Sequence, residues 1–515
     1  MAGPGVAGLP PHAAVRTAGQ LIDVACRLGE QEGLRRAIDW CAEIGTEGLP
    51  PADLSRYHYC VGTAHQGLRD LRRHASPDHG AWEDSDTEKA LVHLRTAVRG
   101  GTKARPLPPT LECRVLTNLS DLFLGVGQPI AAIEYLTKTL ESDPGFGMAL
   151  SNRGRALWAY ARADYDPGHS RLAAAYARRD LLAGIALGVE RQAAPVFRRL
   201  VDSIERRVSL RFLCADHDME SFSLGDTAEE EAYRRWCLGH GLFLNTLNDL
   251  GPYPIAARDI LHLPSIHAPI EEQRPRHHAM YNQMKQEFAS CRYLLYEGLC
   301  LKNPHFSDRD VLLYDAMDDA ALCLALEKTR AAYRIAYSVL DKIACFVHDY
   351  FGVTLTMRKV NFRTVWYVCG KRVRGLAPRF GGMRNWPLKA LFWLSKDIAA
   401  EDGDFADAIE PDASETSRMR NYLEHRVLQL CHGFPPESDD WGAAASGDPS
   451  DAPMIAASRA EFEGKALRLA KTARAALVYL SLAVHAEERQ RRVGRSSAGV
   501  VPQIQLVTIA DDAKR

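Results

Sequence analysis

Helical periodicity dominates this 515-residue chain, and strand signals are sparse. Apolar residues recur at three- and four-residue spacing along most of the sequence, as they do on the buried face of an amphipathic helix. From about residue 14 to residue 207, apolar helical runs alternate with short breaks, which is a pattern of helix pairs. From residue 276 the expected helices lengthen, and the last is expected to run from Met454 to Arg492. The sequence therefore predicts an all-α fold.

The composition restricts where such a chain could act. Apolar residues make up 46% and charged residues 25%, which is typical of a soluble globular protein. The net charge of -1 gives no overall attraction to nucleic acid or membrane, so any such attraction must come from a local patch. No apolar run approaches the ~20 residues of a membrane span. The 12 cysteines are scattered singly without a CxxC, which predicts a cytoplasmic protein with buried thiols and neither disulfides nor a metal site. No cofactor is expected.

The clearest helix pair spans Leu116–Pro144. Ala132 would let its two helices approach closely, Gly127 permits the turn between them, and the final proline ends the second helix. This unit resembles a tetratricopeptide (TPR) repeat, although Ser120 and Thr139 replace two of the small residues usual in that repeat. Stacked pairs build a superhelix whose concave face commonly holds a peptide or protein. A helical bundle without a groove is the alternative.

The chain is accordingly divided into four parts. Residues 14–207 are predicted to form TPR-like helical repeats, and residues 208–275, rich in glycine and proline, a connector. Residues 276–492 are predicted to form a bundle of longer helices, and residues 493–515 a loose tail.

One late helix carries an unusual polar face. The stretch Ser417–Arg426 reads SRMRNYLEHR, and a helix turns about 100° per residue. One face of this helix would be apolar, and it would consist of Met419, Tyr422, Leu423, Val427 and Leu430. The opposite face would consist of Arg420, Asn421, Glu424 and His425. A solvated face explains the arginine and the glutamate, whereas the asparagine and the histidine indicate a function.

The stretch RNYLEH resembles the R-x4–6-H motif of the HEPN superfamily, in which a polar residue commonly follows the arginine. YSVLDKIACFVHDYFG, NWPLKALFWLSKDIA and RMRNYLEHR occur in the same order as in the HEPN branch fused to N-terminal TPR-like repeats. The resemblance covers residues 276–492. It implies a metal-independent endoribonuclease that acts as a homodimer with facing motif helices. It also implies a bacterial defence or stress system that cuts RNA, single-stranded or transfer RNA, when a protein or peptide trigger binds the repeats.

The residues suit that chemistry, because RNA can be cleaved by its own 2′-hydroxyl. His425 could act as general base or acid, and Arg420 could hold phosphate oxygens through two parallel hydrogen bonds. Asn421 completes the predicted catalytic set, and Asp341 and Glu424 are predicted to support it. A symmetric dimer would supply two histidines, one as base and one as acid. The alternatives are an ordinary exposed histidine and a surface pair between Arg420 and Glu424.

A separate feature predicts the RNA contact. Residues 351–396 contain ten lysines and arginines and no acids, interleaved with aromatic residues, a composition that suits phosphates and stacked bases. The predicted RNA-binding residues are Arg358, Lys359, Arg363, Lys371, Arg372, Arg374, Arg379 and Arg384. The interleaved aromatic residues are Phe362, Trp366, Tyr367, Phe380 and Trp386. Alternatively, some aromatics are core, and the arginines are answered by the acidic run of residues 401–415, which could also block them.

Two points remain open at the level of sequence. Some HEPN toxins are regulated through a modified tyrosine two positions after the motif histidine, where this chain has Val427. The N-terminal repeats are therefore the better candidate for control. The rival function is a non-catalytic dimeric TPR/HEPN adaptor, or a module that binds nucleotide or RNA.

Overall fold

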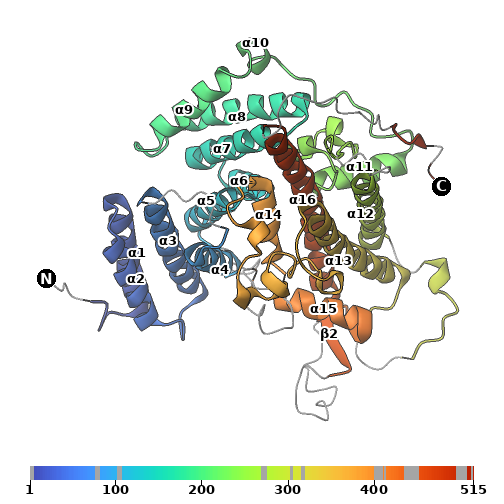
Figure 1. Ribbon diagram of the computed structural model, residues 1–515. Helices are drawn as coiled ribbons and strands as arrows, with labels where there is room; N and C mark the ends of the chain where they lie inside the picture. Colours follow the sequence, from blue (N-terminus) through green and yellow to red (C-terminus); the bar gives the residue numbers. More distant parts are fainter. Residues whose placement is uncertain are drawn as a thin grey trace.

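The computed structural model describes residues 5–75, 82–100, 107–267, 275–301, 305–314, 319–398, 410, 413–433, 452–493, 507–511 and 514. These residues form α-helices and two short strands, which confirms the predicted all-α class (Figure 1). The N-terminal helices are α1 (Pro11–Leu28), α2 (Gln31–Ile44), α3 (Pro51–Ala75), α4 (Ser85–Arg99), α5 (Pro109–Gly125), α6 (Pro129–Ser142), α7 (Gly147–Ala163), α8 (Pro167–Leu187) and α9 (Ala194–Glu205). The later elements are α10 (Leu210–Leu213), α11 (Ala228–Gly239), α12 (Arg276–Cys300), α13 (Leu324–Phe351), α14 (Trp386–Ser395), α15 (Ala413–His425), β1 (Val427–Cys431), β2 (Met454–Ser458) and α16 (Arg459–Val493). Short 3₁₀ helices lie at Thr246–Asp249, Pro254–Ala256, Phe306–Asp308, Met357–Lys359, Val368–Gly370, Arg372–Arg374 and Pro378–Phe380.

The first eight helices pack as consecutive pairs, α1 with α2 through α7 with α8. The predicted unit at residues 116–144 is found as the pair α5 and α6. Gly127 lies in the turn between these two helices with φ of +91°, a backbone conformation that favours glycine. A Cβ at this position would lie 2.5 Å from the carbonyl oxygen of Trp386, at the start of α14. The helix pairs are consistent with a fused repeat domain, whereas their assignment as TPR stays a prediction.

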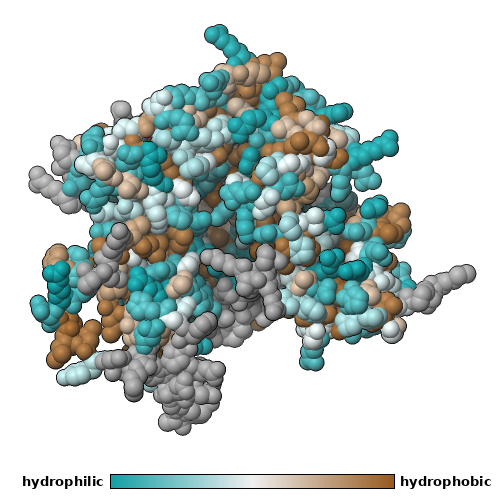
Figure 2. All heavy atoms as spheres, turned by 180° about the vertical axis from the view of Figure 1, so that it is seen from behind, coloured by the Kyte–Doolittle hydropathy of each residue, from teal (hydrophilic) through white to brown (hydrophobic). Residues whose placement is uncertain are grey.

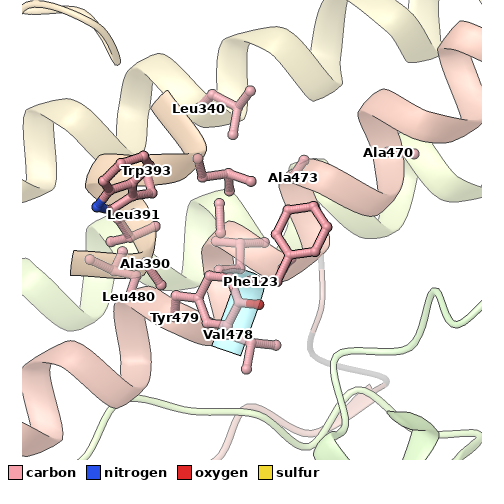
Figure 3. Packing of buried hydrophobic residues seen from close by; sticks show 14 of the residues in the cluster. Phe123, Leu340, Ala390, Leu391, Trp393, Ala470, Ala473, Val478, Tyr479 and Leu480 are labelled. Carbon is pink, nitrogen blue, oxygen red and sulfur yellow. The ribbon is translucent and has the colours of Figure 1, made fainter. Parts of the chain in front are cut away.

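The helices share two hydrophobic cores. A small core joins α1, α2 and α3 around Val15, Ile22 and Leu34. The main core extends from Trp82 to Val484, so it includes both α4–α9 and the C-terminal helices. Figure 3 shows this continuity, with Phe123 of α5 beside residues of α14 and α16. The buried core therefore crosses the boundary predicted after residue 207, and α4 to α9 share it with the later helices.

The connector is fixed to the C-terminal helices by buried arginines. Arg292 of α12 donates to both carboxylate oxygens of Asp259, at 2.8 and 2.7 Å. Arg474 of α16 donates to the carbonyl oxygens of Phe243 and Asn245, at 2.9 and 2.8 Å. Charged groups are tolerated inside a protein only when they are paired in this way. Residues 243–259 are thus held against α12 and α16.

The C-terminal helices surround α13, which packs against both α12 and α16, and α14 lies on α16. A two-stranded parallel sheet of β1 and β2 lies below them, beside α15 (Figure 1). The predicted last helix was wrong at its start, because residues 454–458 form β2 and the helix begins at Arg459. Ile455 and Ala457 alternate with more exposed neighbours, and hydrogen bonds to β1 fix the extended conformation.

An exposed apolar segment precedes α13. The segment Val311–Tyr314, VLLY, is the longest run of exposed large apolar residues within the described parts of the chain. It belongs to the connection that loops out at the right of Figure 1, and brown side chains gather on the corresponding side of Figure 2. Such a run is typical of a protein contact surface. Across the described ranges, no helix is both long and apolar enough to span a membrane.

Candidate functional site

The motif helix α15 has the two faces that its sequence predicts. Met419, Tyr422 and Leu423 are buried against the main core. Arg420 and Asn421 are half-buried on the opposite side, where Glu424 and His425 are exposed.

The helix is shorter than predicted, because it ends at His425 and the chain continues into β1. Val427 and Leu430 therefore belong to a strand, and the prediction that both extend the apolar face of the helix was wrong. Val427 is 55% exposed, whereas Leu430 is buried. The exposure of these two residues follows from pairing with β2 and from the alternation of side chains along β1, and not from helical rotation.

Three side chains of α13 fix the motif helix and the strand that follows it. The Tyr333 hydroxyl donates to the carbonyl oxygen of Thr416 at 2.8 Å. Arg334 donates to the carbonyl oxygen of Leu423, in the last turn of α15. Arg330 donates to the carbonyl oxygen of Leu428 in β1 at 2.9 Å. Because the last carbonyls of a helix have no partner within it and carry partial negative charge, Arg334 stabilises the end that bears His425.

The guanidinium of Arg420 is held from two sides. Its Nη1 donates to Oδ1 of Asn421 at 3.1 Å, and its Cζ lies 5.1 Å from the ring centroid of Tyr337 on α13. Asn421 was predicted to orient the histidine ring or the substrate, whereas its amide oxygen binds the neighbouring arginine. Of the five N–H groups of a guanidinium, one is used in this bond. The others can bind an anion.

Asp341, which was predicted to support the site, contacts the backbone of the basic segment. Its Oδ1 accepts a hydrogen bond from the Phe362 N–H at 3.1 Å. Burial raises the pKa of Asp341, and the Phe362 N–H and Arg420 oppose this rise. Within the described residues, Asp341 and Arg420 form no ion pair, so the carboxylate does not tie the guanidinium directly.

Glu424 and His425 lie at the exposed end of α15. Glu424 pairs with Arg334, whose Nε lies 3.7 Å from its Oε1, so the alternative of a pair with Arg420 is not formed. Both side chains of this pair are over a third exposed, and such pairs contribute little stability. In the described part of the chain, no group hydrogen-bonds the imidazole of His425. The ring is exposed, and none of the described residues fixes its orientation by a hydrogen bond.

The aromatic residues of the basic segment, residues 351–396, do not face solvent. Phe362, Trp366, Tyr367 and Phe380 are all buried, and Trp82 of the N-terminal region packs against Trp366 and Phe380. The prediction that these rings stack on bases was therefore wrong for these four, and the alternative that they are core holds. Their burial supplies an apolar contact with Trp82, which lies just before α4.

The cations of the basic segment divide into two groups. Arg363 is 5% exposed, and burial lowers its pKa to about 10, so it is withdrawn from any surface phosphate. Arg372 pairs with Glu88 of α4 at 2.9 Å, and Arg379 with Glu487 of α16 at 3.2 Å. The exposed members are Arg358, Lys359, Lys371, Arg374, Arg379 and Arg384, of which Arg379 is the one paired with Glu487.

The carboxylates that form ion pairs with the basic segment come from distant parts of the chain. Lys396, at its end, is 3% exposed and pairs with both Glu83 and Glu88, next to and within α4. Most of the acidic run at 401–415 lies outside the described residues. Of its described members, Glu410 pairs with Arg95 of α4, and Glu415 with Lys465 of α16. Neither contacts the basic segment.

Three residues on α13, Arg330, Arg334 and Tyr337, were missed by the sequence analysis, which named only Asp341 on this helix. Arg330, Arg334, Tyr337 and Asp341 are spaced four, three and four apart, so they form one stripe along α13 that faces the motif helix. The spacing was visible in the sequence. The sequence predicted that this helix packs beside the motif helix, but it did not show which of its side chains face α15.

Comparison with protein families identifies this region. Residues 269–487 match the family model described as LA2681-like HEPN, which includes α12 to α15, both strands and most of α16. The C-terminal part of the chain is therefore a HEPN domain of this kind, as the resemblance implied. No curated protein and no solved structure matches the chain.

Proposed function

We propose that this HEPN domain is an endoribonuclease that uses the 2′-hydroxyl of its RNA substrate as the nucleophile. The observation that supports it is the arrangement of Arg420 and His425. Both lie on the solvent side of a helix whose other face is buried, and Asn421 and Tyr337 hold the arginine. A cation in a fixed position and an accessible imidazole on the same helix are the two groups that this reaction needs.

The reaction can be written with these groups. The imidazole of His425 removes the proton of the 2′-hydroxyl, whose oxygen attacks the adjacent phosphorus. The bond from phosphorus to the 5′-oxygen breaks, and a protonated imidazole gives that oxygen a proton. Arg420 stabilises the negative charge on the other phosphate oxygens. The products are a 2′,3′-cyclic phosphate and a 5′-hydroxyl.

The need for two imidazoles supports a homodimer. The motif supplies one histidine in each chain, and a two-fold axis beside α15 would place two copies at one cleft. One would then act as base while the other, protonated, acts as acid. Arg334, Arg358 and Lys359 are the nearby cations for the remaining phosphates. The last two lie four and three residues before Phe362, which contacts Asp341.

The N-terminal helices are proposed as the control element of a triggered effector. Their α4 neutralises Arg372 and Lys396 through Glu88, and it also holds Glu410, three residues before α15, through Arg95. A trigger that moves α4 would change both the available charge and the entry to the motif helix. In a bacterial defence or stress system, such a protein would slow growth only after the trigger binds.

The deciding experiment is cleavage of labelled single-stranded RNA and transfer RNA by purified protein in the presence of EDTA. Wild type is compared with His425→Ala and with the matched control His432→Ala, which removes an exposed histidine just beyond β1. We expect wild type and the control to cut and to leave cyclic phosphate ends, and His425→Ala to lose at least about 100-fold in rate. Equal cutting by His425→Ala would contradict the proposal.

A second candidate is a non-catalytic adaptor that binds RNA or a partner protein. The observation that favours it is that no described residue hydrogen-bonds the ring of His425. A catalytic imidazole is commonly oriented by a hydrogen bond to the ring nitrogen that does not react. RNA binding without cleavage, unchanged in His425→Ala, would support this candidate.

A further inference from the structure

Tyr337 lies beneath the arginine of the motif. It belongs to α13, and the Cζ of Arg420 lies over its ring at 5.1 Å from the centroid. The phenol is half-buried between α13 and α15, and Asp341 lies one turn further along α13. The only described residue that accepts a hydrogen bond from Arg420 is its neighbour Asn421, so the ring is the second element that fixes the guanidinium.

The ring face suits this task for a physical reason. An aromatic face carries negative electrostatic potential, so it attracts a cation, and a planar guanidinium can stack on it without giving up its N–H groups. A carboxylate in the same place would occupy two of those N–H groups, which would then be lost to a phosphate. The ring therefore orients the arginine while its donors remain available.

The phenol remains neutral while it does so. Burial raises the pKa of Tyr337 to about 12, with a contribution from Asp341, whereas Arg420, Arg363 and hydrogen bonding to Ser417 oppose the rise. A neutral ring holds the guanidinium by its face at every pH at which the enzyme would work. Ser417 precedes Arg420 by three residues on α15, so the phenol is also connected to the helix it supports.

We infer that Tyr337 is a positioning residue, whose ring holds the guanidinium of Arg420 so that its free N–H groups face a bound phosphate. This inference rests on the proposed function only in that the phosphate is taken to belong to RNA. It predicts that the effect of Tyr337 passes entirely through Arg420.

The test is a double-mutant cycle on RNA binding in the His425→Ala protein, which keeps the substrate uncut. Fluorescence anisotropy with a labelled RNA gives Kd for the parent, Tyr337→Phe, Tyr337→Leu, Arg420→Ala and Tyr337→Leu with Arg420→Ala. We expect Tyr337→Leu to weaken binding about 3- to 30-fold, the range of a partly buried cation–π contact, and Tyr337→Phe to leave it unchanged. In the Arg420→Ala background, Tyr337→Leu should have no further effect.

Two results would overturn the inference. Tyr337→Phe could bind as weakly as Tyr337→Leu, or Tyr337→Leu could keep its full effect without Arg420. Thermal unfolding checks each variant, and Tyr337→Met, of similar size but without a ring, replaces Tyr337→Leu if that variant does not fold. This test measures binding alone, so its result does not depend on cleavage. If wild type binds RNA but does not cut it in the cleavage assay described above, the proposed function fails and the inference about Tyr337 stands. A parent protein that does not bind RNA overturns both.

Discussion

Two positively charged regions of this protein, the motif helix and the basic segment, differ in what surrounds their cations. On the motif helix, Arg420 and His425 reach solvent, and the arginine is held by neutral partners, an amide oxygen and an aromatic ring. In the basic segment, Arg363 is buried, and Arg372 and Lys396 are paired with carboxylates. The basic segment has more cations, but those that are buried or paired with carboxylates are not available to RNA, whereas Arg420 keeps its charge and most of its donors.

The difference lies in what surrounds each charge. A carboxylate at about 3 Å cancels a cation and occupies its donors, whereas an amide or a ring orients the cation and leaves its charge in place. The number of cations in a stretch of sequence therefore overstates its attraction for RNA when another helix supplies the acids.

The largest expected effect is a loss of stability on breaking the ion pair that follows the basic segment. Arg95 of α4, 6% exposed, donates to both carboxylate oxygens of Asp397 at 2.6 and 2.9 Å, directly after the basic segment. Removing one partner of a buried pair leaves the other charge uncompensated, so we expect Arg95→Ala to lower the free energy of unfolding by about 3–5 kcal/mol. Urea denaturation measures this loss. Arg35→Ala, which removes an exposed arginine of α2, should cost no more than about 0.5 kcal/mol, and equal losses would show that α4 does not fix the segment.

The motif helix should be sensitive to one arginine and not to its neighbour. We expect Arg420→Ala to reduce the rate of RNA cleavage about 100- to 1,000-fold, as loss of a positioned donor to a transition-state oxyanion does. Arg418→Ala removes an exposed charge two residues earlier on the same helix, and its effect should be below about 3-fold. If the two variants reduce the cleavage rate equally, then net charge matters and the position of the arginine does not. That result would contradict the comparison between the two regions.

Acid should loosen the helix that neutralises the basic segment. α4 packs on α3 through histidines, with Nδ1 of His58 2.9 Å from Nδ1 of His93. Burial, with His58 and His65, lowers the pKa of His93 to about 4 from its usual 6.5. The unfolded chain therefore binds this proton at higher pH than the folded one, so this contribution to stability is present above pH 6.5 and is lost as pH falls toward 4.

Thermal unfolding between pH 7 and pH 5 measures that loss, which we expect to be about 1–2 kcal/mol. His93→Gln should reduce the dependence on pH. His12→Gln, which changes an exposed histidine of α1, should keep it. A dependence that is unchanged in His93→Gln would place the titrating groups elsewhere.

The smallest expected effect is on the salt dependence of RNA binding, to which each phosphate contact contributes. Replacing the exposed Arg358 and Lys359 by alanine should lower the slope of log Kd against log salt by about 1–2, since each lost phosphate contact releases about one counterion fewer. Arg372→Ala should leave the slope unchanged, because Glu88 already occupies that guanidinium. Fluorescence anisotropy at several salt concentrations distinguishes the two. A larger change for Arg372→Ala would mean that RNA displaces α4.

Local patterns were predicted well, and pairings between distant parts were not. The two faces of α15 followed from helical rotation, because Met419, Tyr422 and Leu423 are buried and Glu424 and His425 are exposed. The extension of that helix through Val427 failed, and so did the helical start at Met454, because two short strands pair there. A five-residue strand and a helical turn of the same composition cannot be told apart by periodicity alone.

The sequence by itself determined the all-α class, the polar face of the motif helix and the order of segments by which the HEPN domain is identified. These depend on the spacing of residues within single helices, which the chain carries locally. The tertiary structure alone decided that Tyr337 lies beneath Arg420, that the aromatics of the basic segment are core, and that Glu83 and Glu88 neutralise its cations. These facts depend on which helices meet. Such contacts join residues up to 313 positions apart, and no local spacing specifies them.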